Sequence, residues 1–303
     1  MGDQNGIGSG SGSGSLGEEG NSLNYFDNNL QETEYYTCER LKAILQEKRD
    51  NDITLIHANI VSLPYNLYDF NNRLALLDFV PDIIAFSETK ITSRVNAYYK
   101  PHIDGYEFYK SESSTCAGSV GVFVKDDLIV NERPDLDISV PGLIETVWFD
   151  IEQKVHGKKL TIGVFYRHHG LTDIPYFERR LEAVMTKLNA SNANYYLVGD
   201  FNVNSLLYDD EDNIKCFVDM MHANSAVNLI NKPTRFPRGR QWGAPSLLDH
   251  FYTNNLNSIR NIGLFSTDIS DHMPIVSTIN MGAKKKYALM NLILTLEILE
   301  ISV

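Results

Sequence analysis

Cysteine is scarce in this chain. Only three occur among 303 residues, Cys38, Cys116 and Cys216, far apart and without Cys-x-x-Cys spacing. This argues against a disulfide framework and a thiolate zinc site, and it favours a reducing compartment. The chain also lacks a charged segment followed by an apolar one at its start, so we expect no secretory signal and a nuclear or cytoplasmic protein.

Basic residues are outnumbered. There are 27 Lys and Arg against 39 Asp and Glu, a net charge of -12, which argues against a protein that coats nucleic acid non-specifically. Acidic residues gathered around a divalent cation would contribute to that balance. Long apolar runs are also missing. The Leu/Ile-rich stretch 287–303 contains Glu297 and Glu300, so it is too short and too charged for a membrane span.

Composition divides the chain into three parts. Residues 1–52 are a Gly/Ser-rich and polar extension that we expect to be flexible, with one peripheral helix at 38–48. Residues 53–280 form the expected single domain. Residues 281–303 are a tail of unclear role, for which an amphipathic surface helix is one option.

Short apolar runs alternate with helical patterns through the domain, which predicts mixed α/β layers with a sheet that is not purely parallel. We predict strands at 53–60, 82–86, 118–124, 144–151, 160–165, 195–198, 226–230, 247–253, 262–266 and 274–279, with helices at 67–79, 175–189 and 212–224. The strands 144–151 and 160–165 are expected to form a hairpin.

The stretch Tyr195–Asn204, YYLVGDFNVN, is the most informative one. An apolar strand is broken by Gly199, and Asp200 and Asn202 follow it. Since a strand has a period of two, both polar side chains should point the same way while Phe201 faces the core. Such a pair can hold a water or a metal-bound phosphate, although Gly, Asp and Asn are also ordinary turn residues.

Other polar residues occupy the ends of predicted strands. Glu88, Asn59 and Asp271 offer the oxygen ligands that Mg²⁺, or Mn²⁺, prefers. Asp200 would activate a water, and Asn202, His272 and Tyr166 would contact a phosphate. Asp249 would orient His272. Each residue also has a structural interpretation, for example a helix cap or turn for Asp271, a solvated strand end for Glu88 and a surface loop for His168 and His169.

Taken together, the motifs HANIVSLPYNLYDF, GVFYR, YLVGDFNVN, INKPTRF, SLLDHFYTN and ISDHMPI resemble the endonuclease/exonuclease/phosphatase (DNase I-like) superfamily. The resemblance is closest to the apurinic-type endonuclease domain of non-LTR (LINE-type) retrotransposons. It covers residues 53–280 and implies a four-layer α/β/β/α sandwich of two mainly antiparallel sheets with outer helices.

The resemblance assigns roles position by position. Asn59, Glu88 and Asp271 match metal-site residues, Tyr166 and His272 match phosphate contacts, and Asp200, Asn202 and Asp249 match the water-activating Asp, its partner Asn and the supporting Asp. Two positions depart from the pattern. Val61 stands where many relatives have a polar residue, and RHHG after Tyr166 replaces a Tyr-x-Pro-Asn pattern, which weakens an expectation of abasic-site specificity.

We therefore expect a Mg²⁺-dependent endonuclease that nicks one DNA strand to leave a 3′-hydroxyl, as target-primed retrotransposon insertion requires. The loop arginines Arg235, Arg238 and Arg240 are candidate DNA contacts. No membrane partner is expected, the protein should be monomeric, and the reverse-transcriptase portion is absent from this chain. The alternatives are a phosphomonoesterase of the same fold acting on inositol or lipid phosphate, and a decayed retroelement fragment that retains nucleic-acid binding.

Overall fold

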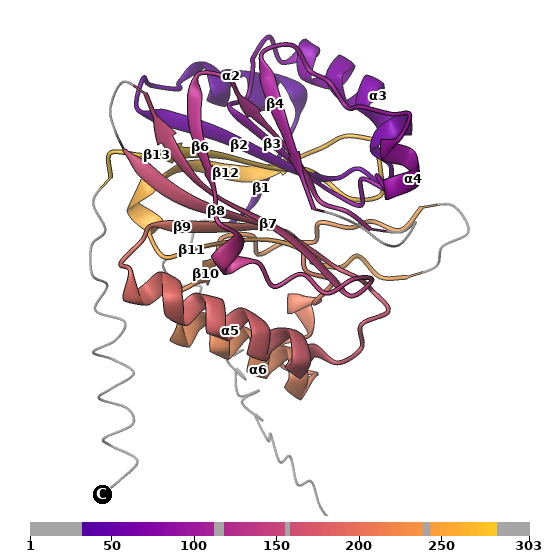
Figure 1. The fold of residues 1–303 in the computed structure, drawn as a ribbon, viewed down its shortest axis with the longest axis vertical. Coiled ribbons are helices and arrows are strands. Elements are labelled where there is room, and N and C mark those ends of the chain that lie inside the picture. The colour runs from indigo at the N-terminus through magenta and orange to yellow at the C-terminus, as the bar shows by residue number, and fades with distance from the viewer. Residues whose placement is uncertain (1–31, 112–117, 155–157, 239–242, 284–303) are drawn as a thin grey trace, which may run out of the picture. The chain divides into compact units, whose positions relative to one another are not determined.

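The computed structural model describes residues 32–111, 118–154, 158–238 and 243–283. Residues 1–31 of the predicted amino-terminal extension, residues 284–303 of the predicted tail and residues 155–157 between the two hairpin strands lie outside these ranges. The described part contains two sheets stacked face to face with helices on their outer faces, which confirms the predicted four-layer architecture (Figure 1).

The first sheet has seven strands, and the second has six. In spatial order the first contains β1 (Glu34–Tyr36), β12 (Ile259–Phe265), β13 (Ile275–Asn280), β2 (Asp52–Asn59), β3 (Ile83–Ser87), β5 (Gly121–Lys125) and β4 (Tyr106–Lys110). The second contains β10 (Val227–Asn228), β11 (Asp249–Thr253), β9 (Tyr195–Asp200), β8 (Lys159–Arg167), β7 (Ile144–Gln153) and β6 (Leu128–Glu132). Only β1/β12, β2/β3 and β8/β9 pair in parallel within the described residues, so both sheets are mainly antiparallel.

Helices cover the two outer faces. α2 (Cys38–Gln46), α3 (Leu63–Leu76) and the short α4 (Ser93–Asn96) belong to the first sheet's side, while α5 (Ile174–Ala190) and α6 (Asp212–Ala223) lie under the second (Figure 1). The described ranges also contain three 3₁₀ turns, which are in chain order η1 (Pro134–Leu136), η2 (Ser205–Leu207) and η3 (Leu256–Ser258). Apolar positions at helical spacing, such as Phe177, Leu181 and Leu188 of α5, are buried as the pattern predicts.

The structure differs from the sequence expectations at the amino end. The helix predicted at 38–48 is present as α2, but it packs on the core instead of lying at the periphery, and residues 34–36 add a strand that was not predicted. Leu41, Ile44 and Leu45 of α2 are buried in the core of the first layer. The ring of Tyr36 lies against Gly263 of β12, and its hydroxyl donates to the carbonyl of Ile262 over 2.8 Å. The burial of these apolar side chains holds the segment on the sheet.

Some element ends also differ. Gly199 was expected to end its strand, but β9 continues through it to Asp200. Gly199 has a φ of 155° there. α3 begins at Leu63, four residues earlier than expected, since Pro64 is well suited to the first turn of a helix. The strands β4 and β6 were not predicted from the sequence. Their residues are mostly half-exposed, which leaves no continuous apolar run to mark them.

Candidate active site

Strand pairing brings the ends of several strands to one edge of the sandwich. In the first sheet Asn59 lies opposite Ser87, the residue before Glu88. In the second sheet Asp200 lies between Tyr166 of β8 and Asp249 of β11, in register with both. The carboxyl ends of parallel strands meet at the same edge, so the pairs β2/β3 and β8/β9 each deliver polar residues there.

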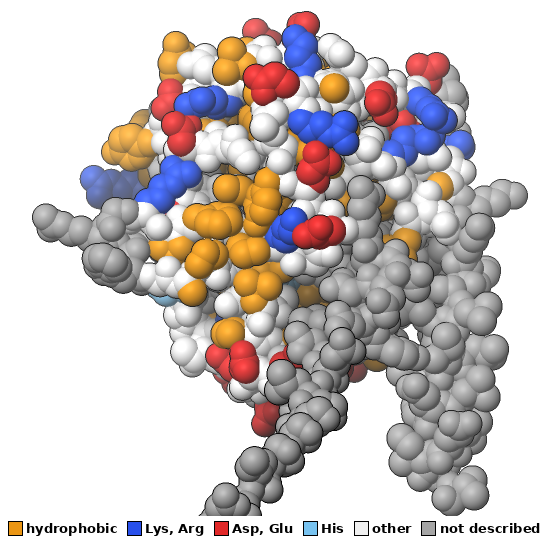
Figure 2. All heavy atoms as spheres, turned by 180° about the vertical axis from the view of Figure 1, so that it is seen from behind, with side chains coloured by type: hydrophobic (Ala, Val, Ile, Leu, Met, Phe, Trp, Pro, Cys, Tyr) orange, Lys and Arg blue, Asp and Glu red, His pale blue; other side chains and the backbone are white. Residues whose placement is uncertain are grey.

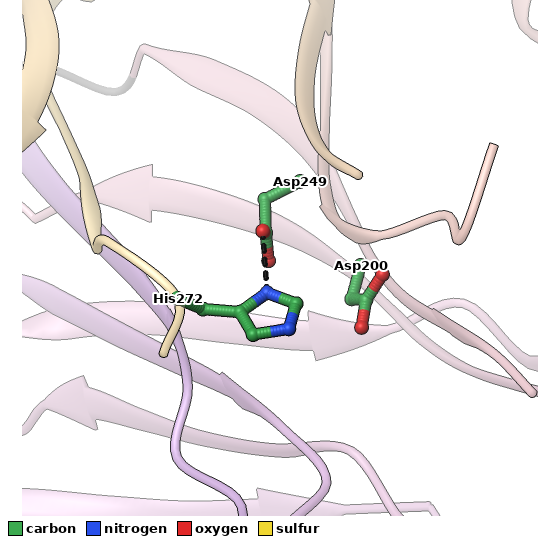
Figure 3. A group of neighbouring side chains, drawn as sticks. All are labelled: Asp200, Asp249 and His272. Carbon is green, nitrogen blue, oxygen red and sulfur yellow. Dashed lines mark hydrogen bonds and ion pairs between the residues drawn. The ribbon is translucent and has the colours of Figure 1, made fainter. Parts of the chain in front are cut away.

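Asp249, His272 and Asp200 form a buried cluster (Figure 3). The Nδ1 atom of His272 is hydrogen-bonded to Oδ2 of Asp249 at 2.7 Å. The third residue, Asp200, completes a set of possible ligand atoms that all lie within 4.8 Å of one another. The imidazole therefore stands between two carboxylates, bonded through one nitrogen and turned toward Asp200 on its other side (Figure 3).

The electrostatics of the cluster follow from burial and proximity. Burial alone would lower the pKa of His272, but the charge of Asp249 and its hydrogen bond outweigh burial and raise this pKa to about 9. Burial tends to raise the pKa of Asp249, yet His272 brings it below the ordinary value. The pKa of Asp200 is raised to about 7, first by burial and then by the charge of Asp249. At neutral pH the site thus offers a cationic imidazole beside a carboxyl that exchanges its proton readily.

Asn59 connects Glu88 with this cluster. Its Nδ2 donates to Oε1 of Glu88 over 3.0 Å and to Oδ2 of Asp200 over 2.9 Å. Its Oδ1 accepts from the backbone N–H of Val61 over 3.1 Å. Val61 thus contacts the site through its backbone N–H. In this arrangement the amide nitrogen of Asn59, and not its oxygen, faces Glu88 and Asp200.

Asp271, a predicted metal ligand, is paired with Arg235 in the structure. Its Oδ2 accepts from Nε of Arg235 at 2.8 Å, and within the described ranges no hydrogen bond joins it to Glu88 or Asn59. Arg238 is exposed and donates to the carbonyls of Asp268 and Thr267. Arg240 lies outside the described residues.

Asn202 and Tyr166 both lie beside Asp200, each in its own way. The backbone N–H of Asn202 donates to Oδ1 of Asp200 over 3.0 Å, while its side chain donates to the carbonyl of Arg167 over 2.7 Å. Asn202 has a φ of 48°, so the two-residue alternation expected for Asp200 and Asn202 does not apply. Tyr166 is buried and its ring lies against His168. Burial, followed by the charge of Glu88, raises its pKa and keeps the hydroxyl protonated.

Three supporting residues were not identified from the sequence. The hydroxyl of Thr234 donates to Oδ2 of Asp249 over 2.7 Å. Buried Arg167 donates to the carbonyls of Phe201 and Asn202 and so fixes the turn that follows Asp200. His57 is fully buried, 3.9 Å from Asp249, and burial lowers its pKa to about 4. Thr234 lies in the same loop as the candidate DNA-contacting arginines, and no local sequence pattern distinguishes its hydroxyl.

The donor chemistry fits a hard divalent cation. Glu88 and Asp271 are carboxylates with 22% and 19% of their side-chain surfaces exposed, and Asn59 adds an amide. Oxygen donors with room for water are what Mg²⁺ takes. No sulfur ligand is present at this edge in the part of the chain that the structure describes.

The two stacked mixed sheets, with helices outside and polar strand ends gathered at one edge, define a DNase I-like fold. Residues 160–276 match the family model described as endonuclease-reverse transcriptase. This match supports the resemblance inferred from the motifs over residues 160–276, and the solved structures below confirm the fold.

Solved structures extend the similarity over most of the chain. The endonuclease domain of TRAS1, a telomere-specific non-LTR retrotransposon, is 17% identical, with 77% of this chain and 100% of that one covered and a TM-score of 0.58. The AP endonuclease LMAP from Leishmania major is 15% identical, with 86% of this chain and 95% of that one covered and a TM-score of 0.63. The Xenopus laevis APE2 catalytic domain is 15% identical, with 75% of this chain and 92% of that one covered and a TM-score of 0.56. A comparison with curated protein sequences finds no match.

Proposed function

We propose that this chain is a Mg²⁺-dependent endonuclease that hydrolyses a phosphodiester of one DNA strand and leaves a 3′-hydroxyl. One observation carries the proposal. The Asp249–His272 hydrogen bond of 2.7 Å is buried beside Asp200, and Asn59 links Asp200 to Glu88. The site thus combines a proton acceptor, a cationic donor and oxygen ligands, as phosphodiester hydrolysis requires.

The residues would divide the reaction as follows. Asp200 accepts a proton from the attacking water, whose oxygen bonds to phosphorus as the bond between phosphorus and the 3′ oxygen breaks. His272, held by Asp249, donates from its free nitrogen to a non-bridging phosphate oxygen. Asn202 and the Tyr166 hydroxyl donate hydrogen bonds to the phosphate. The leaving 3′ oxygen takes a proton from solvent.

Glu88, Asn59 and Asp271 would hold Mg²⁺, or Mn²⁺ in its place, and the bound ion would supply positive charge at the phosphate. Two arrangements in the structure bear on these ligands. Asn59 has to present its oxygen instead of its amide nitrogen, and Asp271 has to release or share Arg235. The oxygen of Glu88 that does not contact Asn59 is 3.9 Å from Nζ of Lys90. Of the two carboxylates, Glu88 would therefore break the longer ionic contact on binding a cation.

DNA is the substrate that the similarities favour, because they include a retrotransposon endonuclease and AP endonucleases. In a retrotransposon the 3′-hydroxyl left by the nick would prime reverse transcription. Arg238, exposed and bound to backbone carbonyls, is the best placed of the two described loop arginines to meet a DNA phosphate. Basic and acidic side chains are interspersed on the face shown in Figure 2.

The described residues include no helix that is long and apolar enough to cross a membrane. All of the site residues come from one chain, so we propose that a monomer is sufficient for activity.

The test is nicking of supercoiled plasmid by the full chain, with Mg²⁺ and with EDTA. We expect cleavage with Mg²⁺ only, and a loss of about 10² to 10⁴-fold in Asp200→Asn. Asp210→Asn, which changes an exposed acid, is the matched control and should cleave normally. Cleavage by Asp200→Asn at the wild-type rate would refute the assignment of Asp200.

The two alternative functions give different results in the same experiment. A phosphomonoesterase would leave the plasmid intact and release phosphate from an inositol phosphate panel. A decayed domain would do neither, while still retarding DNA in a gel. Either result from a folded wild-type chain would overturn the endonuclease proposal.

A further inference from the structure

His57 and Asn59 present two neighbouring polar groups on one face of β2. They are two residues apart in a strand, so their side chains point the same way, toward the second sheet. Asn59 reaches Asp200, as described above. His57 faces Asp249, and Asp200 and Asp249 lie directly opposite each other on β9 and β11. Two polar pairs therefore cross between the sheets side by side.

The pair formed by His57 and Asp249 contains two buried atoms that have no hydrogen-bond partner. Nδ1 of His57 and Oδ1 of Asp249 are 3.9 Å apart, and neither has another partner among the described residues. Both side chains are about 1% exposed, which leaves little access for solvent. Closing the gap by about 1 Å would give an ordinary hydrogen bond. Buried polar atoms are nearly always paired, so these two are each other's natural partners.

The contact between His57 and Ser87 is compatible with the tautomer that would donate to Asp249. The Nε2 atom of His57 is 3.2 Å from the hydroxyl oxygen of Ser87. When the hydroxyl of Ser87 donates to Nε2, the ring carries its proton on Nδ1, facing the carboxylate oxygen.

Building on the proposed function, we propose that His57 is a positioning residue that binds the second oxygen of Asp249 from the opposite sheet. The other carboxylate oxygen already accepts from His272 and Thr234 at 2.7 Å each. With Oδ1 held by His57, the carboxylate plane is fixed, and with it the direction of the bond to His272. His57 does not touch the reacting phosphate. It acts through Asp249, in the way that outer partners orient a working imidazole.

A pair of matched substitutions tests this role in the full chain. His57→Leu removes the donor, whereas His57→Asn is similar in size to leucine and keeps an N–H near the position of Nδ1. We expect His57→Leu to lower kcat for plasmid nicking by about 10 to 100-fold with KM little changed. His57→Asn should recover most of that loss. Equal activity of the two variants would overturn the proposal, whether both are impaired or both are normal.

A second readout does not depend on cleavage. The proton in the hydrogen bond between His272 and Asp249 should give a downfield NMR resonance, assigned by its loss in His272→Gln. We expect this resonance to shift in His57→Leu and to return toward its original position in His57→Asn. Circular dichroism and thermal unfolding identify a variant that fails to fold. An unchanged resonance in a folded His57→Leu variant would refute the positioning role.

The two readouts separate failure of this inference from failure of the proposed function. If the wild type does not nick DNA, the endonuclease proposal fails, and the resonance still decides whether His57 positions Asp249. If the wild type nicks DNA, a cycle with Asp249→Ala applies. His57→Leu should then cause little further loss in that background, because the residue through which it acts has gone. A full additional loss would show that His57 acts independently of Asp249.

Discussion

The pairing of Asp249 with His272 makes a quantitative prediction about double substitution. His272→Ala removes the cationic donor itself. Asp249→Ala removes the charge that raises the pKa of His272 to about 9, and burial then favours the neutral imidazole. Each single change thus eliminates the same donor. Loss of one such donor costs about 10² to 10³-fold in rate, or roughly 2.7 to 4 kcal/mol.

Independent losses would multiply, so the double variant would fall by about 10⁴ to 10⁶-fold. If the two residues act as a unit, the double variant should be no slower than His272→Ala, giving a coupling free energy of roughly 3 to 4 kcal/mol. Single-turnover plasmid nicking at saturating Mg²⁺ measures all four rates. Thermal unfolding shows whether each variant folds, and Asp249→Asn provides a variant of nearly unchanged volume. Multiplying effects in folded variants would show that Asp249 does not act through His272.

Three further predictions concern the metal, the backbone and pH. Glu88→Gln should raise the Mg²⁺ concentration for half-maximal nicking by at least about tenfold, and a metal titration that matches wild type would remove Glu88 from the ligand set. Gly199→Ala should lower the free energy of unfolding by about 3 kcal/mol or more, because Gly199 has a φ of 155° and a Cβ there would meet the backbone of Phe165. Urea denaturation measures this free energy, and a wild-type value would contradict the prediction. Burial lowers the pKa of His250 from 6.5 to about 4, so between these pH values only the unfolded chain binds a proton at this residue. The free energy of unfolding should therefore decrease as the pH is lowered from 6.5 to 4, by up to about 3 kcal/mol. Urea denaturation of wild type and His250→Phe at pH 7 and pH 4.5 checks this, and an equal loss in both would exclude His250 as the cause.

The position of a polar residue in the fold could be predicted from the sequence where that residue lies at the end of a strongly apolar strand. Asp200 follows a buried run, and its pairing with Asp249 in the second sheet follows from strand register. The helices with clear apolar stripes, such as α5, were also found with nearly correct ends. In these places local pattern and tertiary packing favour the same structure.

The remaining features depend on contacts that no local pattern records. Arg235 and Asp271 are 36 residues apart, and their ion pair exists because the loop after β10 lies against the segment before β13. The orientation of the Asn59 amide is set by Glu88, Asp200 and the backbone of Val61 together. β1 has three residues, too few for a period-two signal, and it is defined by its partner β12.

The place of β1 at the end of the first sheet has a consequence for the stability of shortened chains. β1 pairs in parallel with residues 263–265, so it occupies the outer hydrogen-bonding groups of β12. A chain that begins at Ile53 would leave that strand edge unpaired beside Leu264 and Phe265, which are buried in the complete fold. An unpaired apolar edge is a template for strand addition by another molecule. We therefore expect residues 34–36, which lie outside the predicted domain boundary, to protect the sheet against edge-to-edge aggregation.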